Sequence, residues 1–165
     1  MRPGLVSLVG AGPGDPYSLT LAGREALERA DVLVYDKLVP ARLLEWARPE
    51  AERLFVGKEA GNKYLPQSQI NQILIEQARL GKRVVRLKGG DPLIFGRGAE
   101  ELEALSQAGI PYEVLPGVTA ALGAAATTGI PLTHRGEASV VTFVTGHDDP
   151  AKPEAVDWKR LAQQP

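Results

Sequence analysis

Short apolar runs recur along the chain, and most of them are rich in β-branched residues. The runs are nearly unbroken rather than alternating, which is typical of parallel strands that are covered on both faces. The pattern predicts five strands within the first 115 residues and a sixth strand nearer the end of the chain. These strands are expected at residues 4–9, 32–35, 53–56, 83–87, 112–115 and 139–144.

The segments between the runs place apolar residues at helical spacing. Residues 66–80 form the clearest example, with Pro66 near the start and Gly81 just past the end. Strands that alternate with helices predict an α/β fold built on an open, mostly parallel sheet. The other helices are expected at about 19–30, 98–108 and 118–127.

The composition of the chain changes after Leu115, where Pro116-Gly117 predicts a sharp turn or linker. We therefore expect an N-terminal α/β lobe over residues 1–115 and the beginning of a second α/β lobe over residues 116–165. One strand and two helices cannot bury a core alone, so the second lobe is expected to be incomplete.

Charge and composition narrow the class of protein. The 165 residues carry 19 Lys and Arg against 20 Asp and Glu, a net charge of −1, which argues against a basic nucleic-acid surface. No apolar run approaches the ~20 residues needed to span a bilayer, and the N-terminus lacks a signal-peptide pattern. With no cysteine, the chain has no disulfide, thiolate zinc site or cysteine nucleophile. We interpret it as a soluble, cytoplasmic protein without nucleic-acid or membrane partners.

Three glycine-rich loops follow predicted strands. Ligands of open α/β sheets bind beyond the carboxyl ends of the strands, where such loops gather. Glycine lets the backbone approach a ligand closely, so three loops at one edge predict a binding site there. The loops span residues 10–15, 88–98 and 116–120.

Other site types fit the sequence less well. The GAGPGD segment resembles a dinucleotide fingerprint, with Asp36 where a ribose-binding acid would lie, but Asp15 replaces the third glycine and would repel a phosphate. A tight turn without a ligand is the alternative interpretation of this segment. The two histidines, His134 and His147, lie on different predicted loops, so no metal site is expected. The chain also has no Walker loop and no G-x-S-x-G elbow.

Five long motifs follow one another along the chain: GAGPGD (10–15), ADVLVYDKLV (30–39), VGKEAG (56–61), RLKGGDPLIFGRGAEE (86–101) and PGVTAALGAAATTGIPLTHR (116–135). In this order they are similar to one known family, the uroporphyrinogen-III C-methyltransferases among the tetrapyrrole methylases. The resemblance implies a two-lobed enzyme, a homodimer, that uses S-adenosylmethionine and methylates uroporphyrinogen III twice, giving precorrin-2 via precorrin-1 for sirohaem or cobalamin synthesis.

The same resemblance implies roles for individual residues. It implies that Asp36 is a proton acceptor and Lys58 a proton donor, and that Arg97, Glu100 and Arg135 hold the macrocycle. A surface ion pair is the alternative for Asp36 and Lys58, and a simple turn is the alternative for Asp91. Cofactor binding is implied for Pro13, Gly89, Gly90, Asp91, Ile94, Thr119 and Ala120.

Three other functions remain open on the sequence alone. The first is another tetrapyrrole methyltransferase, acting on a later corrin precursor. The second is a dinucleotide-dependent oxidoreductase, and the third is a non-catalytic fragment that binds ligand weakly or only dimerises.

Overall fold

The structure is a computed structural model that describes residues 3–57, 65–145 and 156–163. The chain divides into two compact units, Met1–Ala124 and Ala125–Pro165. The lobe boundary predicted at residue 116 precedes this division, because the first unit continues into the helix that follows Pro116-Gly117.

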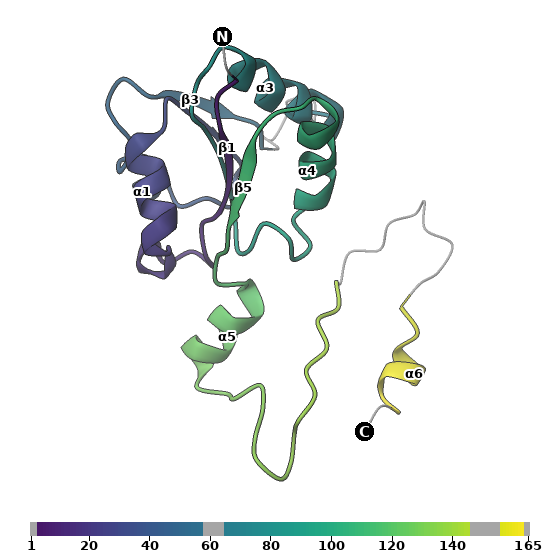
Figure 1. The fold of residues 1–165 in the computed structure, drawn as a ribbon. Helices are drawn as coiled ribbons and strands as arrows, with labels where there is room; N and C mark the ends of the chain where they lie inside the picture. Colours follow the sequence, from purple (N-terminus) through teal and green to yellow (C-terminus); the bar gives the residue numbers. More distant parts are fainter. Residues whose placement is uncertain (1–2, 58–64, 146–155, 164–165) are drawn as a thin grey trace. The chain divides into compact units, whose positions relative to one another are not determined.

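The first unit is built on a five-stranded parallel sheet (Figure 1). All four strand pairings are parallel, and Val6 is in register with both Val84 and Tyr112. The order β3-β2-β4-β1-β5 places β2, β4 and β1 in the interior of the sheet, which explains why nearly all of their residues are buried. The strands are β1 (Val6–Gly10), β2 (Val32–Tyr35), β3 (Glu52–Phe55), β4 (Val84–Lys88) and β5 (Tyr112–Leu115). The prediction of a mostly parallel α/β sheet is confirmed.

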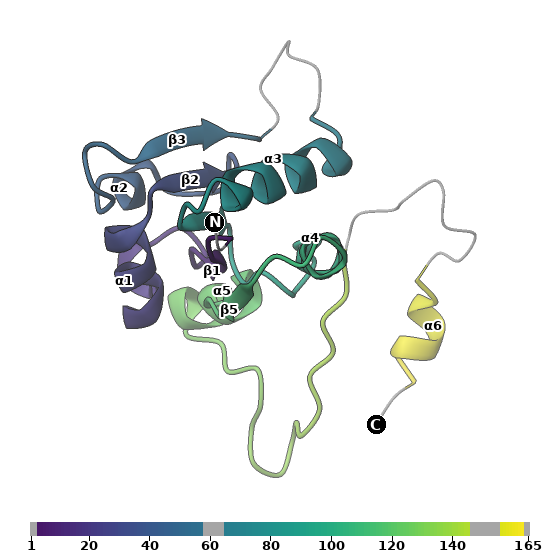
Figure 2. The same ribbon diagram turned by 45° about the horizontal axis from the view of Figure 1, so that its top comes forward.

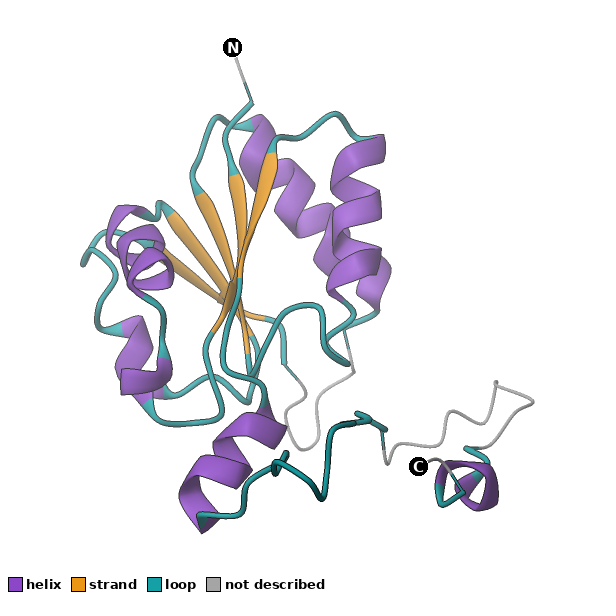
Figure 3. Ribbon diagram, turned by 60° about the horizontal axis from the view of Figure 1, so that its bottom comes forward, coloured by secondary structure: helices purple, strands orange, loops and turns teal. Residues whose placement is uncertain are grey.

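Helices cover both faces of the sheet, α1 and α2 on one side and α3 and α4 on the other (Figures 2 and 3). The hydroxyl of Thr20 caps the start of α1 by accepting a hydrogen bond from the Gly23 N–H at 3.1 Å. The four predicted helices are present, and two further α-helices, α2 and α6, had no predicted range. The elements are η1 (Pro16–Ser18), α1 (Leu21–Arg29), α2 (Ala41–Leu44), α3 (Gln67–Arg79), α4 (Gly98–Gln107), α5 (Ala120–Thr128) and α6 (Trp158–Leu161).

Each face of the sheet carries its own apolar cluster. On the α3 and α4 side, Leu8 packs in one cluster with Leu74 and Leu105. On the α1 and α2 side, Leu87 packs in one cluster with Leu27 and Leu43. Successive strand residues point to opposite faces, so one short apolar run supplies both clusters.

The predicted strand at residues 139–144 is wrong. The structure forms no strand there, and Val140 and Phe143 are 59% and 42% exposed. Among the described residues of the second unit, none is buried, and the β-type pairing is limited to a bridge between His134 and Ala138. An extended apolar run becomes a strand only when a neighbouring strand takes up its backbone hydrogen bonds, and no described residue does so here.

Two glycines let the carboxyl ends of β1 and β5 meet closely. A Cβ on Gly10 would lie 2.5 Å from the Cα of Gly117, and a Cβ on Gly117 would overlap the carbonyl oxygen of Gly90. Side chains are therefore excluded at both positions. Within the described part of the chain, no helix is long and apolar enough to cross a bilayer.

Candidate functional site

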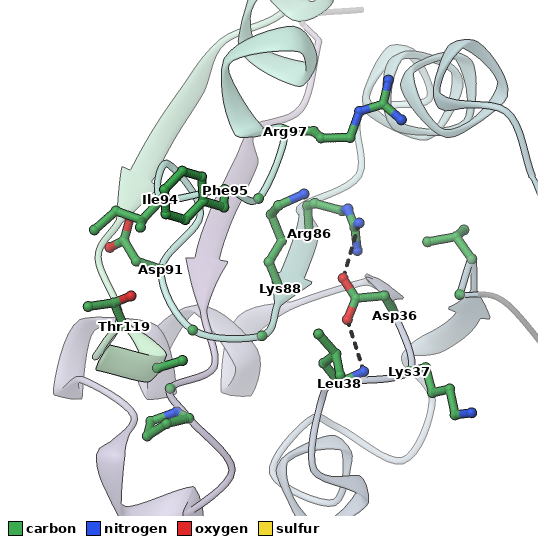
Figure 4. A pocket seen from close by; sticks show the side chains of 18 of the residues that line it. Asp36, Lys37, Leu38, Arg86, Lys88, Asp91, Ile94, Phe95, Arg97 and Thr119 are labelled. Carbon is green, nitrogen blue, oxygen red and sulfur yellow. Dashed lines mark hydrogen bonds and ion pairs between the residues drawn. The ribbon is translucent and has the colours of Figure 1, made fainter. Parts of the chain in front are cut away.

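A cavity of about 610 Å³ opens at the carboxyl edge of the sheet, where the glycine-rich loops gather (Figure 4). Asp36 and Arg97 line it, and so do Lys37 and Leu38, which the sequence analysis did not select. The structure thus brings residues from the segments after all five strands to one site, including Val56 and Gly57 after β3. All seven residues expected to bind the cofactor also line this cavity: Pro13, Gly89, Gly90, Asp91, Ile94, Thr119 and Ala120.

Hydrogen bonds join the three loops to one another. Gly90 donates to the carbonyl of Gly12 at 2.8 Å, and Gly12 donates back to the carbonyl of Gly90 at 3.2 Å. Asp91 accepts from the N–H of Gly117 at 3.1 Å through Oδ2 and from the N–H of Leu93 at 2.9 Å through Oδ1. Asp91 therefore forms the simple turn expected as its alternative role, and it also ties the β4 loop to the β5 loop beside the cavity.

The GAGPGD loop is not arranged as a dinucleotide-binding turn. The carboxylate of Asp15 accepts the N–H of Tyr17 at 2.9 Å and caps the short η1 helix. The helix α1 begins only at Leu21, so the one-turn 3₁₀ helix η1, and not the N-terminus of an α-helix, directly follows the loop. This geometry argues against a pyrophosphate site there.

Gly90 forms a small cradle beside Thr119 and Ala120. Its φ is +65°, a conformation that residues with a side chain rarely adopt. A Cβ there would lie 3.8 Å from the Ala120 nitrogen and 3.9 Å from the Thr119 Cα. Figure 4 shows Asp91, Thr119 and Ile94 on the same side of the cavity.

Asp36 lies directly after β2 with both carboxylate oxygens engaged (Figure 4). Oδ1 accepts the N–H of Leu38 at 3.2 Å, and Oδ2 pairs with an Nη of Arg86 at 3.4 Å. Its side chain is 26% exposed, so the carboxylate is held at the cavity wall and remains accessible. The ion pair expected as its alternative role does form, but with Arg86.

Arg97 and Glu100 form an ion pair at the start of α4. Arg97 Nε and Nη contact the two Glu100 oxygens at 2.8 and 2.7 Å. The hydrogen bond from Arg97 is the main reason that the pKa of Glu100 lies below its ordinary value, although partial burial opposes the shift. Arg97 adopts φ +57° and lines the cavity, whereas Glu100 acts as its partner.

Phe95 lines the cavity from the same loop and was missed by the sequence analysis. Its φ is +52°, and its side chain is 61% exposed. Leu38, which follows β2 and also lines the cavity, is 76% exposed. The cavity therefore has exposed apolar surface beside its charged groups, which suits a ligand with both ring surface and charged substituents.

A buried group of charges forms another wall of the cavity. Arg86 and Lys88 on β4 are each 3% exposed, and both contact Glu101 of α4, which is fully buried. Burial and the neighbouring charge of Arg86 lower the pKa of Lys88, while Glu101 opposes this shift. Charged residues at alternate positions of an otherwise apolar strand, in RVVRLK, were the sequence signal for this group.

Three residues expected to act at the site are not placed in the cavity lining, and the first of them, Glu100, pairs with Arg97 beside it. Lys58 lies outside the described residues. Arg135 belongs to the second compact unit, where its side chain is exposed. Their roles therefore remain predictions.

The sequence and fold are similar to those of known tetrapyrrole enzymes. The family model for tetrapyrrole (corrin/porphyrin) methylases matches residues 5–165. Siroheme synthase 1 of Aeromonas hydrophila is 62% identical over 96% of this chain, and siroheme synthase 2 of Serratia proteamaculans is 59% identical over 96%. The chain spans only 34% of the length of each of these relatives.

Solved structures agree with this similarity. The crystal structure of uroporphyrin-III C-methyltransferase from Thermus thermophilus is 51% identical, with a TM-score of 0.72 over 82% of this chain and 57% of that one. A structure of the Thermus thermophilus enzyme complexed with S-adenosyl homocysteine is 47% identical, with a TM-score of 0.65 over 81% of this chain and 51% of that one. A cobalt precorrin-4 methyltransferase is 35% identical, with a TM-score of 0.70 over 79% of this chain and 52% of that one. The chain belongs to the tetrapyrrole methylase family.

Proposed function

We propose that this chain carries the methyltransferase site of a uroporphyrinogen-III C-methyltransferase that uses S-adenosylmethionine. The reaction methylates uroporphyrinogen III twice and gives precorrin-2 via precorrin-1. The observation that carries the proposal is the cavity at the carboxyl edge of the sheet. One side of it offers small residues and a carboxylate, and another side offers buried cations.

The side formed by the glycine loops fits a positively charged cofactor without phosphate. Asp91 supplies a carboxylate, Thr119 supplies a hydroxyl, and Gly90 leaves open the space that a Cβ would fill. S-Adenosylmethionine carries a sulfonium and an ammonium, which such groups can bind without a basic cradle. When bound, it supplies an electrophilic methyl group. Gly89, Ile94, Ala120 and Pro13 complete this side of the proposed cofactor site.

The opposite side fits a ligand with several carboxylates. Arg97 and the buried pair Arg86 and Lys88 line the cavity, and arginine binds carboxylates in a fixed geometry. The macrocycle of uroporphyrinogen III carries eight carboxylates, so it would meet these cations with its acidic side chains. Glu100 would hold the guanidinium of Arg97, and we propose Arg135 as a further contact.

Asp36 is the proposed proton acceptor. The new carbon–carbon bond forms at a pyrrole carbon, and a proton must then leave the ring system. The Asp36 carboxylate is fixed by the Leu38 N–H and by Arg86, and it is accessible at the cavity wall, so it can take that proton on an oxygen. Lys58 is the proposed proton donor. Alignment of the reacting groups is expected to give most of the acceleration.

The wider setting of the enzyme is also a proposal. We infer a homodimer in the cytoplasm, with residues from Pro116 onward beginning a second lobe. The chain spans about a third of each of the two siroheme synthases. Similarity to a cobalt precorrin-4 methyltransferase favours one alternative substrate, a later corrin precursor.

Two substitutions test the division of the cavity. Arg97→Ala should weaken binding of uroporphyrin III by about tenfold and leave the affinity for S-adenosylhomocysteine within about twofold, because it removes a charged partner of the carboxylates only. Gly90→Val should do the reverse, because a branched side chain at φ +65° is strained and fills the cradle. Isothermal titration calorimetry measures both affinities.

The control is Arg79→Ala, an exposed arginine at the end of α3 that does not line the cavity. Equal loss of both ligands in Arg97→Ala would contradict the proposed division. Product mass after incubation with uroporphyrinogen III and S-adenosylmethionine then tests the reaction. Methylation of a later corrin precursor instead would support the alternative.

A further inference from the structure

Two cations occupy positions of β4 that the fold would otherwise fill with apolar side chains. Val84, Arg86 and Lys88 follow the two-residue period of the strand on the side that faces α3 and α4. Val84 contributes to the apolar cluster there, whereas the next two positions on this face are charged. The charges begin where the strand approaches the cavity.

Glu101 of α4 binds both cations from the side away from solvent. Arg86 Nε donates to Glu101 Oε1 at 3.0 Å, and Lys88 Nζ lies 3.1 and 3.0 Å from the two Glu101 oxygens. Gln67 of α3 adds a hydrogen bond to the same carboxylate at 3.2 Å. With Asp36 on Arg86, the group has two positive and two negative charges.

Arg86 and Lys88 line the cavity, but Glu101 does not. Lysine has a flexible stem with many rotamers, and a carboxylate that accepts with both oxygens restricts where its ammonium can lie. Arg86 is likewise restrained by Glu101 at one end and by Asp36 and the Val34 carbonyl at the other. Figure 4 shows the two cationic groups side by side next to Asp36, with Arg97 beyond them.

Stability does not explain a buried group of this kind. Replacing a buried ion-pair group by apolar residues of similar volume is often neutral or stabilising. Among the described residues, the fully buried Glu101 carboxylate accepts side-chain hydrogen bonds from the two cavity-lining cations and from Gln67. These contacts orient the two cations, which is a use other than stability.

We propose that Glu101 is a positioning residue that fixes Arg86 and Lys88 in the cavity wall, so that the carboxylates of a polyanionic ligand meet cations that are already oriented. The proposal deepens the proposed function and rests on it for the identity of the ligand. Glu101 acts through its two partners and has no contact with the ligand itself.

The substitution Glu101→Gln tests this role, with Glu103→Gln as its matched control. Glu103 lies on the same helix and is exposed. Glu101→Gln should weaken uroporphyrin III binding by about tenfold and leave S-adenosylhomocysteine affinity within about twofold, whereas Glu103→Gln should change neither. Unchanged uroporphyrin III affinity in a folded Glu101→Gln variant would overturn the proposal.

A second measurement does not depend on either ligand. The ¹³Cε signal of Lys88 is titrated by NMR in the wild type and in Glu101→Gln and is assigned with Lys88→Arg. The charged groups around Lys88 are Arg86 on β4, Glu101 and Glu100 on α4, and Asp36 after β2. Because loss of the Glu101 charge destabilises the ammonium, Lys88 should release its proton at lower pH in the variant. An unchanged titration would overturn the proposal.

These measurements separate failure of the inference from failure of the proposed function. If the wild type binds neither uroporphyrin III nor S-adenosylhomocysteine, the proposed function fails, and the Lys88 titration alone decides the role of Glu101. If Glu101→Gln does not fold, the apolar triple variant R86M/K88M/E101L replaces it. A folded triple variant that binds uroporphyrin III as the wild type does would overturn the proposal, and one that has lost only this ligand would support it.

Discussion

The two faces of β4 carry different kinds of side chain. Toward α1 and α2, the strand presents Val85 and Leu87, which pack in an apolar cluster with Leu27 and Leu43. Toward α3 and α4, the same strand presents Arg86 and Lys88, both buried and both bound to Glu101. One face is built from apolar contacts, and the other depends on balanced charges.

The difference shows how a central strand can serve stability and a ligand site together. Because side chains alternate between faces, the residues for each purpose are neighbours in sequence and lie on opposite sides of the sheet. The apolar face can then be changed without moving the cavity wall. The charged face cannot lose Glu101 without leaving Lys88 buried and without its carboxylate partner.

The largest expected effect comes from removing the shared carboxylate. Glu101→Leu should lower the free energy of unfolding by about 4 kcal/mol, because Arg86 and Lys88 would stay buried without their common partner. Denaturation in urea, followed by circular dichroism, measures this change. A loss under about 1 kcal/mol would show that the two cations reach solvent or other partners.

A smaller loss is expected on the apolar face. Leu87→Ala should lower the free energy of unfolding by about 3 kcal/mol, since it leaves a cavity in a fully buried cluster. The ligand affinities of the folded variant should stay within about twofold of the wild type, because Leu87 does not line the cavity. The control is Phe143→Ala in the second unit, where the side chain is 42% exposed and a small change is expected.

The smallest expected effect is a difference between the two faces of β4 in how the free energy of unfolding depends on pH. Burial and Arg86 lower the pKa of Lys88 in the folded chain, so the unfolded chain binds more protons between that pKa and the usual lysine value of about 10.4. The contribution of Lys88 to the free energy of unfolding should therefore rise with pH in this window. Below this pH window, the buried ammonium of Lys88 lowers the free energy of unfolding.

The substitution Lys88→Met removes this contribution. Urea denaturation of both proteins at several alkaline pH values should show the wild type gaining stability relative to Lys88→Met as the pH rises toward about 10. Leu87→Ala should show no such relative change. A constant difference between wild type and Lys88→Met would indicate that the pKa of Lys88 is the same in both states.

Much of the fold could be predicted because the parallel strands are short, apolar and continuous. The runs at 32–35 and 112–115 coincide with β2 and β5. The run at 139–144 is also short and apolar. It was wrongly predicted to be a strand, because strand formation depends on a pairing partner that the sequence of the run does not specify. Local sequence predicts an extended apolar segment, whereas the sheet is a property of its neighbours.

The position of the site was predictable, but its internal contacts were not. Glycine loops after parallel strands meet at one edge, so Gly90 and Asp91 could be placed at a common site. The internal contacts depend on side-chain geometry. Asp91 accepts hydrogen bonds from backbone N–H groups with both of its oxygens, and Arg97 pairs with Glu100. The pairing of Glu101 with Arg86 and Lys88 was not predicted, because the core was sought among apolar residues.

The contact between Gly10 and Gly117 limits how this protein can vary. A tight contact between large side chains can be relieved when one residue is replaced by a smaller one. A larger residue on one side of such a contact can therefore be compensated by a smaller residue on the other side. Here both residues already lack a side chain, and neither can shrink to make room for the other. Single substitutions at either position have no compensating change across the contact. The close approach beyond the carboxyl ends of β1 and β5 is therefore fixed, and sequence variation is confined to the neighbouring loops.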